Sequence, residues 1–143
     1  MKKPTILLIE DDELDIISVE RSLKKIESGY ILHTAYNGIE ALKMLRNTTI
    51  VLKPDVILLD INMPKMNGIE FLKILRADDI LKDSKVFIMT TSSESSDRSA
   101  AEELGISGYI LKPLNYTDNN KRSDSMDAFV QFHLRKILLN ENT

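Results

Sequence analysis

The stretch DVILLDINMPKMNG, residues 55–68, places an acid at the end of a strongly apolar run. The run from Val56 to Leu59 is short and aliphatic, which is typical of a strand buried on both faces of a sheet. Asp60 follows it directly, and a loop containing Pro64 and Gly68 comes next. The sequence therefore predicts a buried strand that holds a carboxylate rigidly at the edge of the core.

Apolar runs of this kind alternate along the chain with segments of helical period. The expected strands cover residues 5–10, 30–35, 55–60, 85–90 and 108–112, and the expected helices cover residues 12–27, 37–47, 67–78, 95–105 and 125–140. Consecutive strand–helix units predict a parallel sheet with helices on both sides and right-handed crossovers. In such a sheet the functional crevice lies beyond the carboxyl ends of the strands, where Asp60 would stand.

The composition limits the kinds of protein that this chain can be. Its 143 residues, 43% of them hydrophobic, suffice for one core, and we expect a single domain over residues 1–143. A net charge of −3 and a pI near 5.4 give no basic field for nucleic acid. The absence of cysteine excludes disulfides and thiolate chemistry. Without a signal peptide or a membrane-spanning run, we expect a soluble cytoplasmic protein that does not bind membranes.

Polar side chains suited to phosphate chemistry follow four of the expected strands. Besides Asp60, they are Glu10 and Asp11 after the first strand, Thr90 at the end of the fourth and Lys112 at the end of the fifth. Parallel strands bring these ends to one edge. Crowded carboxylates repel one another, and Mg²⁺ accepts such ligands together with water and phosphate. A carboxylate can attack phosphorus, so the set predicts phosphoryl transfer by positioning and charge neutralisation.

With these residues, the chain resembles the receiver domain of two-component response regulators. The single-domain chemotaxis regulator is the simplest member of that family. The similarity runs from about Pro4 to Pro113 and rests on four motifs in order, LLIEDD, LLDINMPKMNG, IMTTSS and GYILKP. The resemblance implies a flavodoxin-like, doubly wound five-stranded parallel sheet of order 2-1-3-4-5 with five helices. It also implies a Mg²⁺ cofactor.

The resemblance assigns the acidic residues individually. Asp60 is the expected phosphoacceptor and also a metal ligand. Asp11 would bind Mg²⁺ directly, Glu10 mainly through water, and Asn62 through its backbone carbonyl. Asp12 would face solvent at the start of the first helix, where negative charge suits the helix dipole.

The remaining positions are expected to bind the phosphoryl group and to switch. Lys112 would neutralise one phosphoryl oxygen, and Thr90 would move toward another. Tyr109 would then rotate inward from an exposed position. The bond between Lys112 and Pro113 is expected to be cis, a state found in only about 5–6% of bonds that precede proline.

The function implied by the resemblance is two-component signal transduction. A histidine kinase or a histidine phosphotransfer protein would supply the phosphoryl group, and the surface of the fourth strand, fourth helix and fifth strand would then change its affinity for a downstream protein. We expect no output domain and no enzyme activity beyond the domain's own phosphorylation and dephosphorylation. The sequence identifies neither the kinase nor the downstream protein, and it leaves a homodimer open.

Three alternative functions fit the sequence less well. A Mg²⁺-dependent phosphatase of the haloacid-dehalogenase type would carry a second Asp two residues after its nucleophile, where this chain has Asn62. A flavin-binding module of the same topology would need a phosphate-binding loop where residues 10–12 are all acidic. A receiver that acts only as a scaffold is disfavoured by the intact acceptor, hydroxyl and lysine positions.

Some features depart from the commonest pattern of the family. Thr91 stands where a smaller residue is common, and the polar segment 113–125 is longer than usual, so it is either a solvated insertion or a partner-specific surface. The long segment 113–125 and some extra length before the third strand resemble features of the regulators that partner phytochrome-type kinases. Neither His33 nor His133 has a partner at metal-binding spacing, so both are expected to be structural.

Overall fold

The structure is a computed structural model that describes residues 3–47, 49, 52–61, 63, 66–90, 95–112 and 125–137. The elements follow the predicted order: β1 (Thr5–Ile9), α1 (Glu13–Leu23), β2 (Ile31–Ala35), α2 (Gly38–Leu45), β3 (Val56–Asp60), α3 (Gly68–Ala77), β4 (Val86–Thr90), α4 (Ser95–Glu103), β5 (Gly108–Leu111) and α5 (Ser125–Ala128), which continues as a π-helical segment, η1 (Phe129–Leu134). Across these described residues, no helix is long and apolar enough to cross a membrane.

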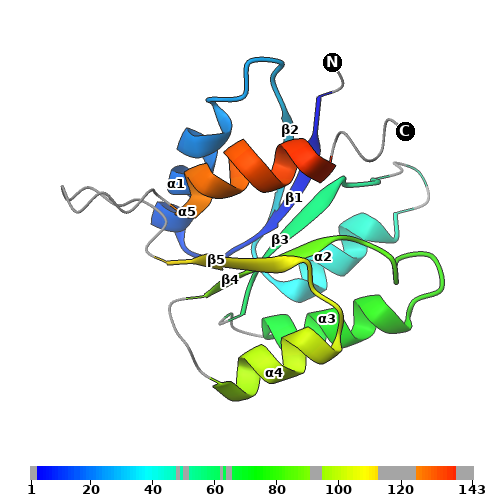
Figure 1. The fold of residues 1–143 in the computed structure, drawn as a ribbon. Helices are drawn as coiled ribbons and strands as arrows, with labels where there is room; N and C mark the ends of the chain where they lie inside the picture. The colour runs from blue at the N-terminus through cyan, green and yellow to red at the C-terminus, as the bar shows by residue number, and fades with distance from the viewer. Residues whose placement is uncertain are drawn as a thin grey trace.

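The strands form one parallel sheet in the order β2-β1-β3-β4-β5. Ile9 pairs with Leu59, and Thr90 pairs with Leu111, so the carboxyl ends of these strands lie at the same edge. Helices α1 and α5 cover one face of the sheet, and α2, α3 and α4 cover the other (Figure 1). The predicted flavodoxin-like, doubly wound fold with strand order 2-1-3-4-5 is confirmed.

Every residue of β3 is buried, because helices cover both faces of this central strand. Successive side chains point to opposite faces. Leu58 packs in one core with Val19 of α1 and Phe129 of the last helix. Leu59 packs in the other core with Phe71 of α3. Each fully buried side chain of this size contributes about 1.5–3 kcal/mol, and this packing fixes the position at which Asp60 leaves the strand.

Side-chain caps fix where the first three helices begin. The side-chain oxygens of Asp12, Asn37 and Asn67 accept hydrogen bonds from backbone N–H groups in the first turns of α1, α2 and α3, respectively. At α3 the cap is reciprocal, because the Glu70 side chain accepts from the Asn67 N–H. The role predicted for Asp12 at the start of the first helix is confirmed.

Helix α1 and the last helix differ most from the prediction, the first in its extent and the second in its geometry. Helix α1 ends at Leu23 rather than at residue 27, because the next hydrogen bonds span three residues instead of four, as in Ile26 N–H to Leu23 O. The last helix becomes π-helical at Phe129. There the rings of Phe129 and His133 lie 4.8 Å and 5.4 Å from the ring of Phe87, so His133 packs against β4.

Arg76 joins three segments at the edge of the sheet opposite Asp60. Its guanidinium donates hydrogen bonds to the backbone carbonyls of Leu104 (2.6 Å), Lys82 (2.8 Å), Ser84 (2.8 Å) and Gly105 (2.9 Å). These carbonyls lie at the end of α4 and before β4 and β5. The planar fork of donors that arginine presents suits several acceptors at once. Arg76 therefore fixes how the chain enters the two strands that end at the site.

Candidate functional site

Asp60 is the last residue of β3 and is only 4% exposed. The chain after it returns closely, because the Gly68 N–H donates to the Ile61 carbonyl at 2.8 Å. A Cβ atom on Gly68 would lie 2.7 Å from the carbonyl oxygen of Asp60 and 2.8 Å from the Cα of Ile61. Only glycine permits this approach. The return of the chain therefore holds the backbone of Asp60 from one side while the sheet holds it from the other.

Two further acids meet Asp60 at this edge. Glu10 and Asp11 follow β1, the neighbour of β3, and Glu10 is fully buried whereas Asp11 is exposed. One carboxylate oxygen from each of Glu10, Asp11 and Asp60 lies within 4.8 Å of the others. Oε2 of Glu10 accepts hydrogen bonds from the backbone N–H groups of Asp11 (3.1 Å) and Asp12 (3.3 Å). The predicted convergence of the three acids is confirmed.

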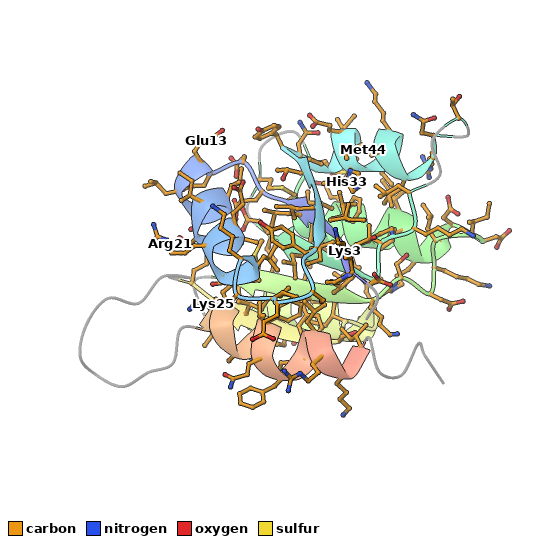
Figure 2. The ribbon with its side chains drawn as sticks, turned by 90° about the horizontal axis from the view of Figure 1, so that it is seen from above. Lys3, Glu13, Arg21, Lys25, His33 and Met44 are labelled. Carbon is orange, nitrogen blue, oxygen red and sulfur yellow. The ribbon has the colours of Figure 1, made fainter. Side chains whose placement is uncertain are left out.

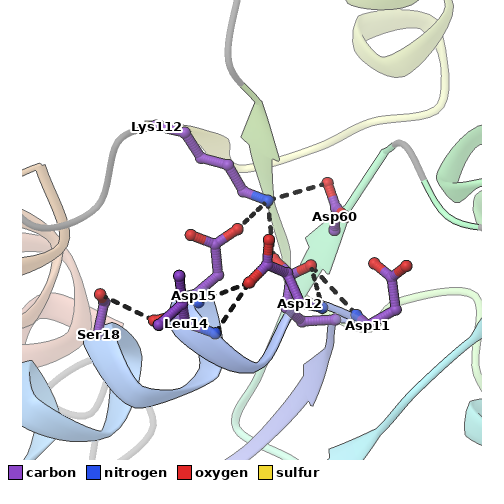
Figure 3. Close-up of polar contacts among 8 residues, drawn as sticks. Asp11, Asp12, Leu14, Asp15, Ser18, Asp60 and Lys112 are labelled. Atoms are coloured by element: carbon purple, nitrogen blue, oxygen red, sulfur yellow. Dashed lines mark hydrogen bonds and ion pairs between the residues drawn. The ribbon is translucent and has the colours of Figure 1, made fainter.

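Lys112 reaches into this cluster from the end of β5 (Figure 3). Its backbone N–H donates to the Thr90 carbonyl at 2.8 Å. Its Nζ atom lies 2.7 Å from Oδ2 of Asp15, 2.9 Å from Oε1 of Glu10 and 3.4 Å from Oδ1 of Asp60. The predicted meeting of Lys112 with Asp60 is therefore observed. The contact with Asp15 was not predicted.

Burial and neighbouring charges shift the pKa values of two groups in this pocket. Burial raises the pKa of Glu10 to about 8; the Lys112 ammonium opposes this shift and the nearby Asp60 carboxylate adds to it. Burial lowers the pKa of Lys112, but its bonds to Asp15 and Glu10 and the charge of Asp60 outweigh that effect and raise it above its usual value. The pocket holds the carboxylates of Glu10, Asp11, Asp15 and Asp60, which is more negative charge than Lys112 alone neutralises.

The donor set fits a hard divalent cation. Mg²⁺ prefers oxygen ligands and is commonly bound by one or two carboxylates with water completing its shell. Glu10, Asp11 and Asp60 offer one oxygen each to a common point. A bound dication would also favour the ionised form of Glu10, whose pKa is raised first by burial and then by the nearby Asp60 carboxylate. The site can therefore hold a metal ion beside the carboxylate of Asp60.

Thr90 lies on β4, the neighbour of β3, and Tyr109 lies on β5, the next strand in the sheet. Thr90 is the last residue of β4 and is 7% exposed; Asp60 pairs with Met89, so Thr90 lies one position further along that edge. Tyr109 is half-buried rather than exposed over its whole side chain, as the prediction had it, although its hydroxyl contact with Glu102 lies at the surface. Its hydroxyl donates to the Arg98 backbone carbonyl at 3.0 Å, because the ring packs against α4.

Several predictions lie outside the described residues, and sequence reasoning missed one contact. Asn62, Pro113 and the rest of the segment 113–124 are not described, so the cis bond and the backbone metal ligand stay predictions. Asp15 was missed. A signal was present, because side chains in the first turn of a helix point back toward its N-terminus and hence toward the end of β1.

This fold and this edge of carboxylates and lysine define a receiver domain. The chain matches the family model described as the response regulator receiver domain over residues 6–122, and it belongs to that family. Receiver domains are signalling proteins of two-component systems that partner with histidine kinases or phosphotransfer proteins. The chain is 37% identical over 113 residues to the transcriptional regulatory protein PrrA of Mycobacterium leprae, an alignment covering 79% of this chain and 45% of PrrA.

Solved structures of response regulators resemble this one over nearly their whole length. A two-component response regulator from Legionella pneumophila is 45% identical, with a TM-score of 0.75 over 94% of this chain and 98% of that one. The phosphorylated cyanobacterial phytochrome response regulator RcpA is 28% identical, with a TM-score of 0.81 over 94% and 96%. The Mn²⁺-bound form of the response regulator Rcp1 is 29% identical, with a TM-score of 0.78 over 92% and 94%.

Proposed function

We propose that this receiver domain accepts a phosphoryl group on Asp60 and signals by the resulting change in its surface. The observation that carries the proposal is the position of the Asp60 carboxylate. It is buried at the end of β3 and lies 3.4 Å from the Lys112 ammonium, next to two further acids. A buried carboxylate that only capped a helix would not require this set of partners.

The proposed step is a displacement at phosphorus. A carboxylate oxygen of Asp60 forms a bond to the phosphorus of a phosphohistidine or an acyl phosphate, and the bond from phosphorus to the donor's nitrogen or oxygen breaks. The donor leaves with the electron pair of the broken bond. Little covalent chemistry is required of the protein beyond positioning and charge neutralisation. Lys112 supplies positive charge to one phosphoryl oxygen, and the Thr90 hydroxyl donates to another.

We infer that Mg²⁺ is the cofactor, held by Glu10, Asp11 and Asp60 with the Asn62 carbonyl as a further ligand. When bound, it would neutralise negative charge on the phosphoryl group. The convergent carboxylate oxygens support this inference. The similar protein Rcp1, whose crystal structure is of a Mn²⁺-bound form, supports it as well. Lys112 compensates part of the acidic charge in this pocket.

The donor and the response follow from the family. We infer that a histidine kinase or a histidine phosphotransfer protein supplies the phosphoryl group, and that the domain does not act as a turnover enzyme. A phosphoryl group adds about −1.5 to −2 charges beside Lys112 and Thr90. Thr90 ends β4, and Tyr109 on β5 contacts α4. The added charge can therefore change the surface made by β4, α4 and β5, which a downstream protein would bind.

Incubation with acetyl phosphate and Mg²⁺ tests the proposal, with intact mass as the readout. The wild type is expected to gain the mass of one phosphoryl group, and D60N is expected to gain none. The control is D79N, which removes an exposed acid remote from β3 along the chain and should be labelled like the wild type. Labelling of D60N to the same extent as the wild type would refute Asp60 as the acceptor.

A further inference from the structure

We propose that Asp15 is a positioning residue for Lys112, which holds the ammonium so that one N–H bond is directed at the phosphoryl site on Asp60. The proposal rests on the proposed function of Asp60. It adds a residue of α1, Asp15, to a site that otherwise consists of residues at the ends of strands. Figure 3 shows Lys112 between the carboxylates of Asp15 and Asp60.

The three contacts of Lys112 match its donors in number. An ammonium group has three N–H bonds and no acceptor. Its nitrogen lies 2.7 Å from Asp15, 2.9 Å from Glu10 and 3.4 Å from Asp60. The contact with Asp15 and the ion pair with Glu10 hold the ammonium from two sides. The longest contact, to Asp60, is then the one that a phosphoryl oxygen would replace. A phosphoryl oxygen on Asp60 would accept from the ammonium there without displacing the other two partners.

The contact between Asp15 and Lys112 is shielded from water, unlike an ordinary surface ion pair. The side chain of Lys112 is 11% exposed and that of Asp15 is 22% exposed. Surface pairs contribute little because water screens them and both side chains must be ordered. The 2.7 Å separation is in the range of charge-assisted hydrogen bonds. Asp15 is therefore able to fix the direction of the ammonium.

Asp15 can serve as a fixed point because the turn that carries it is itself held. The Asp12 side chain caps α1 by accepting from the N–H groups of Leu14 (2.8 Å) and Asp15 (3.4 Å). The Ser18 hydroxyl donates to the Leu14 carbonyl at 3.0 Å. Lys112, by contrast, has a flexible four-carbon side chain. Without Asp15, the ammonium would keep one short contact, to Glu10, and the longer one to Asp60, so part of its population would point away from Asp60.

Beryllofluoride, a stable mimic of the phosphoryl group, tests the proposal in the presence of saturating Mg²⁺. The variants are D15A, which removes the contact, D15E, which keeps a carboxylate, and E13A as the control. Glu13 is an exposed acid in the same turn of α1, so E13A removes an equal charge; Figure 2 shows it at the outer end of the helix. The readouts are the Kd for beryllofluoride, the Kd for Mg²⁺ and the Tm.

We expect D15A to weaken beryllofluoride binding about tenfold relative to E13A, the lower end of the effect of removing a residue that orients a ligand-binding group. The Mg²⁺ affinity and the Tm of D15A should match those of E13A, and D15E should recover most of the lost affinity. Equal beryllofluoride affinity in D15A and E13A would overturn the proposal. A parallel loss of Mg²⁺ affinity and Tm in D15A would also overturn it, because the role would then be structural. If the wild type itself does not bind beryllofluoride, the proposed function fails instead.

Discussion

The guanidinium carbon of Arg98 lies 4.4 Å from the centre of the Tyr109 ring. The tyrosine hydroxyl also donates to the Arg98 backbone carbonyl and lies 3.3 Å from Oε1 of Glu102. Arg98 and Glu102 both belong to α4, so one helix holds the ring and the hydroxyl of the residue proposed as the switch. A cation over an aromatic ring contributes about 0.5–1 kcal/mol at an exposed site and more when water is excluded.

Removal of the Arg98 side chain is therefore expected to release Tyr109 in the unphosphorylated protein. R98A loses the cation but keeps the backbone acceptor, so its Tyr109 population should shift about two- to fivefold toward other positions, as the energy of one cation–π contact dictates. NMR of ¹³C-labelled tyrosine rings measures the shift. R98K is the matched control because it keeps a cation near the ring. Identical Tyr109 signals in R98A and the wild type would show that the guanidinium does not hold the ring.

Replacement of Lys112 by Met should have opposite effects on metal and on phosphoryl binding. The ammonium repels a dication in the same pocket but attracts a phosphoryl oxygen. We expect K112M to bind Mg²⁺ about fivefold more tightly, an energy of about 1 kcal/mol at the dielectric of a partly exposed site. The same variant should accept the phosphoryl group from acetyl phosphate much more slowly. Calorimetric titration with Mg²⁺ measures the first effect, and weaker Mg²⁺ binding in K112M would contradict the account.

The raised pKa of Glu10 predicts a pH dependence of stability in the metal-free protein. The folded protein binds this proton more tightly than the unfolded chain, because the folded pKa is about 8 and the ordinary value is 4.5. The stabilisation by protonated Glu10 is complete below about pH 4.5 and is lost as the pH rises through about 8. The Tm of the wild type in EDTA should therefore fall relative to that of E10Q across this interval.

The difference in Tm between the wild type and E10Q isolates the contribution of Glu10, because the other titrating groups are the same in both proteins. Saturating Mg²⁺ should reduce the fall in the wild type, since a dication favours the ionised carboxylate. Parallel Tm curves for the wild type and E10Q in EDTA would mean that the folded pKa of Glu10 is not raised.

The chain offers a matched pair of glycines that tests the support of Asp60. Gly68 and Gly38 each follow an asparagine cap and begin a helix. A methyl group on Gly68 would meet the backbone of residues 60 and 61, whereas one on Gly38 would meet first the Met66 sulfur at 2.8 Å, in a side chain that can move. We expect G68A to lose about 1–3 kcal/mol of unfolding free energy, the range for overpacking, and to be phosphorylated more slowly. G38A should lose less, as measured by urea unfolding; equal losses would contradict this.

The sequence predicted the fold and most of the site, because both depend on local patterns. Aliphatic runs such as Val56 to Leu59 define strands, and parallel strands bring their carboxyl ends together, which places Asp60 near Glu10 and Lys112 without knowledge of any contact. Contacts set by packing were beyond this reasoning. The partners of Tyr109 depend on how closely α4 packs against β5, and the carbonyls around Arg76 come from segments distant in sequence. The residue where α1 ends depends on whether the next backbone hydrogen bonds span three residues or four.

The most direct test of the central claim is to locate the phosphoryl group. The wild-type protein would be phosphorylated with acetyl phosphate and Mg²⁺, treated with borohydride to reduce the acyl phosphate to a stable alcohol, digested and sequenced by mass spectrometry. The account predicts that residue 60 is converted to homoserine, with the other acids of the pocket, Glu10, Asp11 and Asp15, unchanged. Modification of any of those residues in place of Asp60 would contradict it.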